Sequence, residues 1–298
     1  MNNTIKHDNN TNNDININNS VGLLNFGNTC FMNSGIQLIM SAPDLCQHFL
    51  NNEKLMNTKL KKYIKTIADY MNVTTNTLGP KILYTSYKKL NTRYHGLSQE
   101  DAREFLTYTL DDIVTNIREL EKPQFSQYIE NTESLLTYVL ETKVTKKNST
   151  ESPSIISYRE VLLPLPLPLE NLTLENCYKN FTLEDDEEKV IEYSLKNLLK
   201  YLYVAVKRFQ CDGKRISKRQ ENVEIPFLTD MFGPIYLLKG FIVHMGSMNS
   251  GHYVTYASRT IDSKTTWYLY NDNSVTEISA ETIEQKSKIA YVFLYVKS

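Results

Sequence analysis

The chain has 298 residues, a formal net charge of −1, 41% hydrophobic residues and 22% charged residues. This length allows one large domain or two small ones with a sizeable core. The balanced charge gives no reason to expect nucleic acid or a membrane surface as a partner, and we find no apolar run of about 18 residues. We expect an intracellular protein, cytoplasmic with the nucleus as an alternative, that works as a monomer.

The first 20 residues are mostly Asn, with Thr, Asp and an occasional Ile. They cannot bury enough apolar surface to offset the entropy lost on ordering, so we expect a disordered tail. The four cysteines, Cys30, Cys46, Cys177 and Cys211, form no Cys-x-x-Cys pair. That spacing argues against a zinc ribbon and, in a reducing compartment, against a disulfide framework. We expect no metal and no cofactor.

Residues 21–37 read Val-Gly-Leu-Leu-Asn-Phe-Gly-Asn-Thr-Cys-Phe-Met-Asn-Ser-Gly-Ile-Gln. Gly22 and Gly27 allow tight turns, and apolar residues from Ile36 to Met40 predict the buried side of a helix that ends near Pro43. Cys30 then lies at a helix N-terminus, where unpaired N–H groups and the helix dipole favour a thiolate. A nucleophilic cysteine is expected there, although a lone cysteine is more often a small buried apolar residue.

Apolar residues at helical spacing predict helices between Leu45 and Leu90. His48 and His95 sit in no chemical constellation there, and we interpret both as surface or packing residues.

A capped amphipathic helix is predicted from residue 97 onwards, where the sequence reads Leu-Ser-Gln-Glu-Asp-Ala-Arg-Glu-Phe-Leu. Ser98 and Asp101 form a capping signal, and an apolar stripe from Ala102 to Ile117 follows. Asp101 and Glu104 are three residues apart, so they project from one side of the helix and are placed to meet a cationic peptide. Capping and charge recognition both stay open, because Asp101 can do both.

The middle of the chain is expected to be mainly extended. We predict extended segments from Phe125 to Leu169, and Val161–Leu169, in which Leu alternates with Pro, as an edge strand or a polyproline-like connection. Leu172–Phe181 predicts a short helix, and Leu198–Phe209 a strand. The cation-rich segment that follows carries Lys214, Arg215, Lys218 and Arg219; a solvated hairpin is favoured over a nuclear signal or an anion patch.

Two strand-like runs lie between Phe241 and Tyr256, separated by a loop of Gly, Ser and Asn. His252 opens the second run, where a rigid element can hold it while the loop moves. His244 lies in the first run and is interpreted as structural or channel-lining. Further strands are predicted over residues 267–272 and 290–296.

Three of these segments resemble the ubiquitin-specific proteases, a family of papain-like deubiquitinating cysteine proteases. Gly-Leu-x-Asn-x-Gly-Asn-Thr-Cys-Phe-Met-Asn-Ser-x-x-Gln is similar to the family's cysteine box, and Gln-x-Asp-x-x-Glu-Phe-Leu from residue 99 is similar to its second box. Gly-His-Tyr, then Trp-Tyr-x-x-Asn-Asp-x-x-Val, then Ala-Tyr-x-x-x-Tyr, is similar to its histidine box. The resemblance covers about residues 21–296.

The resemblance implies an α+β, papain-like fold for residues 21–298. It comprises a helical thumb (about 21–122), a reduced fingers sheet without a zinc site that leads into the palm (about 123–205), and a β-rich palm (about 206–298). It also implies hydrolysis of the peptide or isopeptide bond after the C-terminal glycine of ubiquitin. Ubiquitin or ubiquitinated proteins would be the partners.

Five residues would carry the chemistry implied by the resemblance. Cys30 would attack the carbonyl carbon, and His252 would take its proton and later protonate the leaving amine. Asn271 would orient the imidazole, with Asp272 as a possible substitute. The Cys30 backbone N–H and the Asn25 side-chain amide would bind the oxyanion.

Five further residues are expected to contact the substrate: Asp101, Glu104, Gln99, Gln37 and Tyr253. Asp101 and Glu104 would face the arginine-containing tail of ubiquitin, and Tyr253 would line the channel for its terminal glycines. Two alternatives stay open. The shortened fingers leave room for a protease of a ubiquitin-like modifier, and a catalytically idle ubiquitin-binding module is the other, although such a module would be expected to lose one of the catalytic residues.

Overall fold

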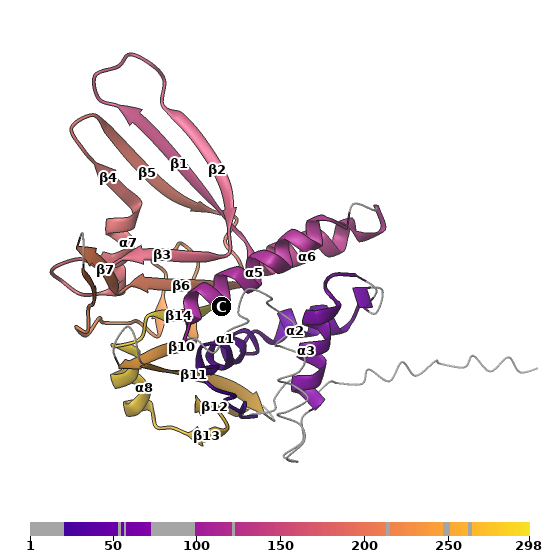
Figure 1. The fold of residues 1–298 in the computed structure, drawn as a ribbon. Helices are drawn as coiled ribbons and strands as arrows, with labels where there is room; N and C mark the ends of the chain where they lie inside the picture. Colours follow the sequence, from indigo (N-terminus) through magenta and orange to yellow (C-terminus); the bar gives the residue numbers. More distant parts are fainter. Residues whose placement is uncertain are drawn as a thin grey trace, which may run out of the picture.

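The computed structural model describes residues 21–52, 55–56, 58–72, 99–120, 123–212, 215–246, 251–261 and 264–298. These residues form a group of helices, a large sheet beside it and a second sheet that projects away from both (Figure 1). The predicted N-terminal tail and His95 lie outside the described residues. The α+β expectation is confirmed by this arrangement.

The helices of the first half cluster beside the large sheet. They are α1 (Cys30–Ile39), α2 (Pro43–Leu50), α3 (Lys61–Asn72), α5 (Ala102–Arg118), the short 3₁₀ helix η2 (Pro123–Phe125) and α6 (Ser126–Leu136). α1 packs against both α5 and β11 (Gly251–Ile261), and every one of its residues is buried. The helix that begins at Cys30 is therefore enclosed between the helical layer and the sheet.

Two sequence expectations about these helices need correction. α5 begins at Ala102 with Asp101 as its N-cap, three residues later than the Ser98 signal predicts. Residues 126–136, expected to be extended, form α6, in which Tyr128, Thr132 and Leu136 recur every four residues and are buried. That spacing places all three on one face of a helix.

The large sheet has eight strands in the order β13-β12-β11-β10-β14-β6-β3, with β9 also paired to β10. Besides β11, they are β3 (Leu162–Pro166), β6 (Tyr201–Lys207), β9 (Leu228–Thr229), β10 (Tyr236–Gly246), β12 (Lys264–Asn271), β13 (Ser274–Glu277) and β14 (Val292–Lys297). β3 is at the edge and parallel to β6, which confirms the edge-strand prediction for the Leu-Pro segment. Proline is tolerated at an edge because only one side of the strand needs donors.

The large sheet separates two apolar cores. Tyr201, Tyr203 and Ala205 of β6 face the core shared with the helices. Leu202 and Val204 face the other core, which also contains residues of α7 (Leu174–Thr182) and α8 (Ala280–Ser287). Because side chains alternate between the faces of a strand, burial on both faces explains the unbroken apolar run in β6.

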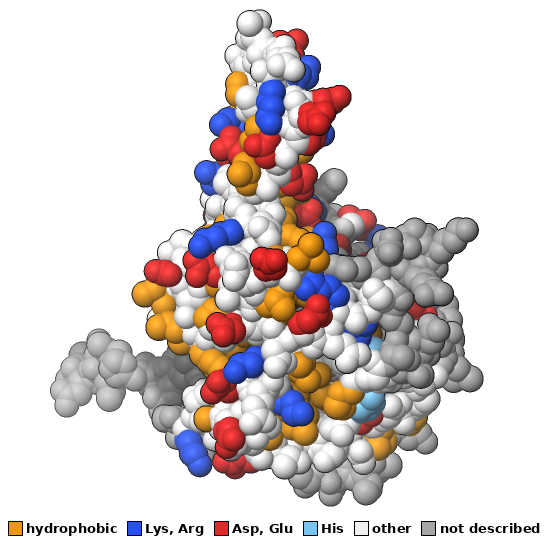
Figure 2. All heavy atoms as spheres, turned by 90° about the vertical axis from the view of Figure 1, so that its left-hand side faces the viewer, with side chains coloured by type: hydrophobic (Ala, Val, Ile, Leu, Met, Phe, Trp, Pro, Cys, Tyr) orange, Lys and Arg blue, Asp and Glu red, His pale blue; other side chains and the backbone are white. Residues whose placement is uncertain are grey.

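The projecting sheet is antiparallel, in the order β2-β1-β5-β4. Its strands are β1 (Tyr138–Lys146), β2 (Ser154–Glu160), β4 (Leu183–Asp185) and β5 (Lys189–Lys196). Side chains of both charge signs are interspersed along it (Figure 2), including the cross-strand pair Lys143–Glu192 at 2.6 Å. Exposed pairs of this kind contribute about 0–1 kcal/mol each, so they favour solubility and register more than stability.

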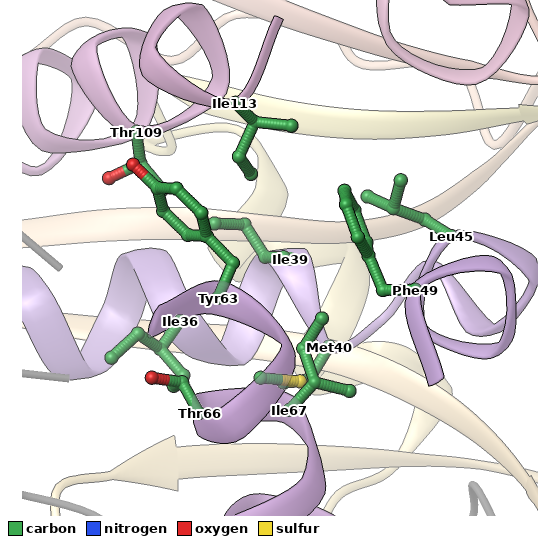
Figure 3. A pocket seen from close by; sticks show the side chains of 10 residues that line it. All are labelled: Ile36, Ile39, Met40, Leu45, Phe49, Tyr63, Thr66, Ile67, Thr109 and Ile113. Atoms are coloured by element: carbon green, nitrogen blue, oxygen red, sulfur yellow. The ribbon is translucent and has the colours of Figure 1, made fainter. Parts of the chain in front are cut away.

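A small apolar cavity of about 20 Å³ lies among α1, α2, α3 and α5 (Figure 3). Its lining residues are Ile36, Ile39, Met40, Leu45, Phe49, Tyr63, Thr66, Ile67, Thr109 and Ile113. Thr109 Oγ1 is buried and has no hydrogen-bond partner among the described residues.

Candidate active site

The segment before Cys30 is bound to the turn between β12 and β13. The Leu23 N–H donates to the Asp272 carbonyl at 2.8 Å, and any Cβ on Gly22 would overlap the backbone of Asn273. Glycine is needed at position 22 because its backbone lies directly against the backbone of Asn273. We call residues 21–29 the cysteine loop. The contact with Asp272 and Asn273 fixes where this loop enters α1.

The side chain of Asn25 shapes the loop itself. Its Oδ1 accepts from the N–H groups of Gly27 at 3.0 Å and Thr29 at 3.2 Å. Gly27 and Asn28 have positive φ values of 88° and 56°, the left-handed region that Gly and Asn tolerate best. The loop turns sharply, and Cys30 follows as the first residue of α1.

Cys30 is 1% exposed, and the Tyr253 N–H donates a hydrogen bond to its thiol. Burial raises the pKa of Cys30 above its ordinary value. The Tyr253 N–H opposes this shift, and the negative charge of Asp272 adds to it. The expectation of a thiolate at the helix N-terminus is therefore wrong for the free protein, since desolvation outweighs the helix dipole. At neutral pH the group is a thiol, and it needs a base.

The candidate base is His252, the residue directly before Tyr253. His252 Nε2 is 2.6 Å from Asn271 Oδ1 and 3.8 Å from Asp272 Oδ2. An amide oxygen only accepts hydrogen bonds, so Nε2 carries the ring proton and Nδ1 keeps its lone pair. The pairing of β11 with β12 brings His252 and Asn271 together although they are 19 residues apart.

Asp272 faces the cysteine loop more closely than it faces His252. Its Oδ2 accepts from the Asn25 Nδ2 at 2.9 Å, and its Oδ1 accepts from the Asn33 Nδ2 at 2.7 Å. Asn33 is 2% exposed and also donates to the Leu23 carbonyl at 3.3 Å. Sequence reasoning missed Asn33. The available signal was a polar amide about one helical turn after Cys30, in a helix whose residues are mainly apolar.

Gln37 was expected to contact substrate, and that prediction is wrong. It is 2% exposed, donates to the Val21 carbonyl at 2.7 Å and accepts from the Tyr70 hydroxyl at 2.7 Å. A side chain with both ends bonded inside the protein is closed to a substrate. Gln37 instead anchors the N-terminal end of the cysteine loop.

Gln99 also has an internal partner in this structure. Its Oε1 accepts from the Gly251 N–H at 2.9 Å, and its Nε2 donates to the Gly251 carbonyl. The amide thus pairs with both backbone groups of the residue before His252, where a substrate contact was expected. It joins the segment before α5 to the start of β11.

Asp101 and Glu104 lie at the N-terminus of α5, as predicted. Asp101 accepts from the Glu104 N–H at 2.9 Å, and its side chain is 27% exposed. Burial raises the pKa of Asp101, while that hydrogen bond and Arg103 oppose the shift. Burial and, after it, the charge of Asp101 raise the pKa of Tyr253, which is 6% exposed, so the two side chains are neighbours.

The cation-rich hairpin is not simply solvated. It consists of β7 (Phe209–Asp212) and β8 (Arg215–Lys218). Lys218 donates to the His244 carbonyl at 2.6 Å, and Arg219 donates to the Leu167 and Pro168 carbonyls at 2.9 and 2.7 Å. These two cations hold the fold together, while the side chains of Lys214 and Arg215 lie outside the described residues. His48, as expected, is a packing residue stacked on Tyr128 with ring centroids 4.3 Å apart.

Within the described ranges, no group of three His, Cys, Asp or Glu side chains could hold a metal ion. No helix in the same ranges is long and apolar enough to span a bilayer.

The family profile described as ubiquitin carboxyl-terminal hydrolase matches residues 21–295. The chain belongs to this family. Ubiquitin carboxyl-terminal hydrolase 2 of Rattus norvegicus is 25% identical, with 92% of this chain and 53% of the relative covered. The probable ubiquitin carboxyl-terminal hydrolase 16 of Schizosaccharomyces pombe is also 25% identical, with 93% and 66% covered. The chain thus spans about half to two thirds of the length of these curated relatives.

Solved structures confirm the fold of this hydrolase family for the chain. A chain of the SAGA DUB module Ubp8/Sgf11/Sus1/Sgf73 bound to monoubiquitin superposes with a TM-score of 0.78 at 22% identity. The same module bound to ubiquitin aldehyde gives 0.76 at 24% identity. In both cases the match covers 93% of this chain and 69% of the other.

Proposed function

We propose that this chain is a deubiquitinating thiol protease that hydrolyses the peptide or isopeptide bond after the C-terminal glycine of ubiquitin. One observation carries the proposal. The Cys30 thiol accepts from the Tyr253 N–H, next to His252, whose Nε2 is held 2.6 Å from Asn271 Oδ1. A buried thiol, an imidazole whose Nδ1 keeps its lone pair and an amide that fixes the tautomer are the parts a cysteine protease needs.

The proposed reaction starts from the neutral thiol. His252 Nδ1 takes the Cys30 proton as the sulfur attacks the carbonyl carbon, and the imidazolium then protonates the leaving amine. A thioester to ubiquitin remains. His252 then removes a proton from water as it attacks, and the thiol is released. Asn271 holds the imidazole throughout and stabilises its charged form.

The oxyanion would be bound by the Cys30 backbone N–H and the Asn25 amide. The Asn25 Nδ2 carries two hydrogens, and Asp272 accepts one of them at 2.9 Å. No other acceptor among the described residues takes the second hydrogen, which we assign to the developing negative charge. Asp272 thereby orients the donor before the reaction starts, and such preorganisation is what makes oxyanion stabilisation effective.

Substrate recognition would centre on the N-terminus of α5. Asp101 and Glu104 place two carboxylates there, which suits a basic peptide tail. Tyr253 would line the channel for the terminal glycines. Ubiquitin is favoured as the modifier because the fold matches structures solved with monoubiquitin and with ubiquitin aldehyde.

The test is reaction of the purified protein with ubiquitin carrying a C-terminal thiol-reactive group. We expect one covalent adduct, located at Cys30 by peptide mapping and lost in Cys30→Ala. Cys46→Ala is the matched control. It removes a thiol that is 0% exposed, whose pKa burial raises to about 12, and the adduct should persist.

The same reagent made with ubiquitin-like modifiers tests the substrate. Labelling by another modifier alone would move the function to that pathway. Binding of ubiquitin without any adduct would favour the idle binding module. We also propose an intracellular, cytoplasmic or nuclear, monomer; the free thiols of Cys30, Cys46 and Cys177 suit a reducing compartment. Fractionation of tagged cells and light scattering test location and mass.

A further inference from the structure

His252 lies almost at the end of its strand ladder. It pairs with Met245, and the last pair of the β10–β11 ladder is Gly246 with Gly251. The ends of ladders open more readily than their centres, because fewer neighbouring hydrogen bonds hold them. A histidine that must face Cys30 reproducibly therefore needs support from outside the ladder.

Gly251, the residue before His252, is held from two directions. The Gln99 amide pairs with its N–H at 2.9 Å and with its carbonyl. The ring of His244 covers its Cα so closely that any Cβ at position 251 would overlap the His244 Nε2 and Cε1 atoms. We call Gln99, His244 and Lys218, together with Gly251, the Gly251 clamp.

Lys218 fixes the ring of His244. Its Nζ lies 3.1 Å from His244 Nδ1, 2.6 Å from the His244 carbonyl and 3.4 Å from the Gly246 carbonyl. An ammonium only donates, so His244 Nδ1 accepts and the ring proton is on Nε2. The next residue, Arg219, is bonded to the Leu167 and Pro168 carbonyls, which anchors the backbone that carries Lys218.

Rings pack around His244 and exclude water. It is 7% exposed, and its ring centroid lies 4.5 Å from that of Tyr253 and 6.2 Å from that of Phe209. Burial, then the charges of Lys218 and His252, lower the pKa of His244 to about 4. His244 is therefore neutral at physiological pH, as its bond from Lys218 requires.

We propose that Lys218 and His244 are positioning residues for the proposed reaction, holding Gly251 together with Gln99 so that His252 faces Cys30. This inference rests on the proposed function. A neutral His244 matters because His252 becomes an imidazolium when it takes the Cys30 proton. A protonated His244 would lose its bond from Lys218 and repel that charge.

The experiment compares Lys218→Met with Lys207→Met, which removes an exposed cation from the end of β6. The substrate is ubiquitin with a C-terminal fluorogenic amide. We expect kcat of Lys218→Met to fall about tenfold with KM unchanged, because loss of alignment slows chemistry without weakening binding. Lys207→Met should match wild type. An unchanged kcat in Lys218→Met would overturn the clamp. So would a fall in kcat that is fully matched by the fraction of unfolded Lys218→Met protein measured by circular dichroism.

The pH dependence of kcat distinguishes a positioning role of Lys218 from a purely structural one. The charged or titratable groups around His244 are Lys218 from β8 and His252 and Tyr253 from β11, with Asp101 behind Tyr253. Removing the cation raises the pKa of His244 from about 4, so the acid limb of kcat should move to higher pH in Lys218→Met. An acid limb at the wild-type position contradicts the proposal.

Failure of the proposed function can be told apart from failure of the clamp. Wild-type protein that does not cleave ubiquitin defeats the function. The clamp is then read without substrate, from ¹H–¹⁵N spectra of the histidine rings. We expect the Nε2–H form of His244 in wild type, and altered His252 ring signals in Lys218→Met. Identical His252 signals in the two proteins would defeat the clamp.

Discussion

The cysteine side and the histidine side of the proposed centre are held by different means. Residues 21–33 are held by side-chain amides and by contacts with the β12–β13 turn, whereas His252 is held near the end of the β10–β11 ladder, by Asn271 and through the Gly251 clamp. Asn271 and Asp272, adjacent in the chain, serve the two sides separately. Asn271 bonds to His252, and Asp272 bonds to Asn25 and Asn33. Replacing one of the pair at a time should therefore separate loss of chemistry from loss of structure.

Asn271→Ala should have the largest effect on the histidine side. Without the acceptor at 2.6 Å, the imidazole loses its preferred tautomer and orientation. We expect kcat to fall at least about 100-fold, with a much smaller change in KM, because the group that fails acts in the chemical step. Steady-state cleavage of ubiquitin with a C-terminal fluorogenic amide measures both. A loss below about threefold would mean that Asp272, 3.8 Å from His252 Nε2, takes over.

Asp272→Asn should act mainly on the cysteine side. Asn tolerates the left-handed φ of 49° at this position, so the change isolates the carboxylate. Buried Asn33 loses a charged acceptor, which should cost about 1–3 kcal/mol in the free energy of unfolding, measured in urea. We expect kcat to fall about tenfold through the misplaced Asn25 donor. Asp230→Asn, at an exposed position, is the control, and equal stability of the two variants would refute the role of Asp272.

The rate of Cys30 alkylation by iodoacetamide should show the protonation state directly. Burial raises the pKa of Cys30 above its ordinary value of 9.0, so the reactive thiolate is scarce at pH 7. The rate in the free protein should rise with pH and reach no plateau below pH 9. Because the charge of Asp272 also raises this pKa, Asp272→Asn should speed alkylation at pH 8 about threefold. A plateau by pH 7 would restore the thiolate expected from the helix N-terminus alone.

Local sequence patterns could be predicted from the sequence, whereas contacts between distant segments could not. Cys30 and His252 each lie in a local pattern of turn or strand residues, and the resemblance to the ubiquitin-specific proteases implies their roles and that of Asn271. The partners of Gln37 and Asn33 could not be predicted, because they depend on which distant segments meet. The main-chain carbonyl and the side-chain Oε1 of Gln37 accept from Arg259, 222 residues away, and Asn33 donates to Asp272, 239 residues away. The protonation of Cys30 was mispredicted for the same reason. The dipole effect follows from local sequence, whereas the burial that outweighs it comes from packing against β11.

Thr109→Val should give the smallest effect and serve as the control for the whole comparison, since Thr109 touches neither side. Its buried Oγ1 has no partner among the described residues and lines the cavity behind α1 (Figure 3). Valine has nearly the same shape without the hydroxyl, so the unsatisfied group disappears and no space is created. We expect the free energy of unfolding to rise by about 1 kcal/mol, with kcat and KM unchanged. A destabilised variant would mean that an internal water bonds to Thr109. A stabilised variant with altered kcat would show that α1 transmits packing changes to Cys30, in which case stability and chemistry on the cysteine side could not be separated.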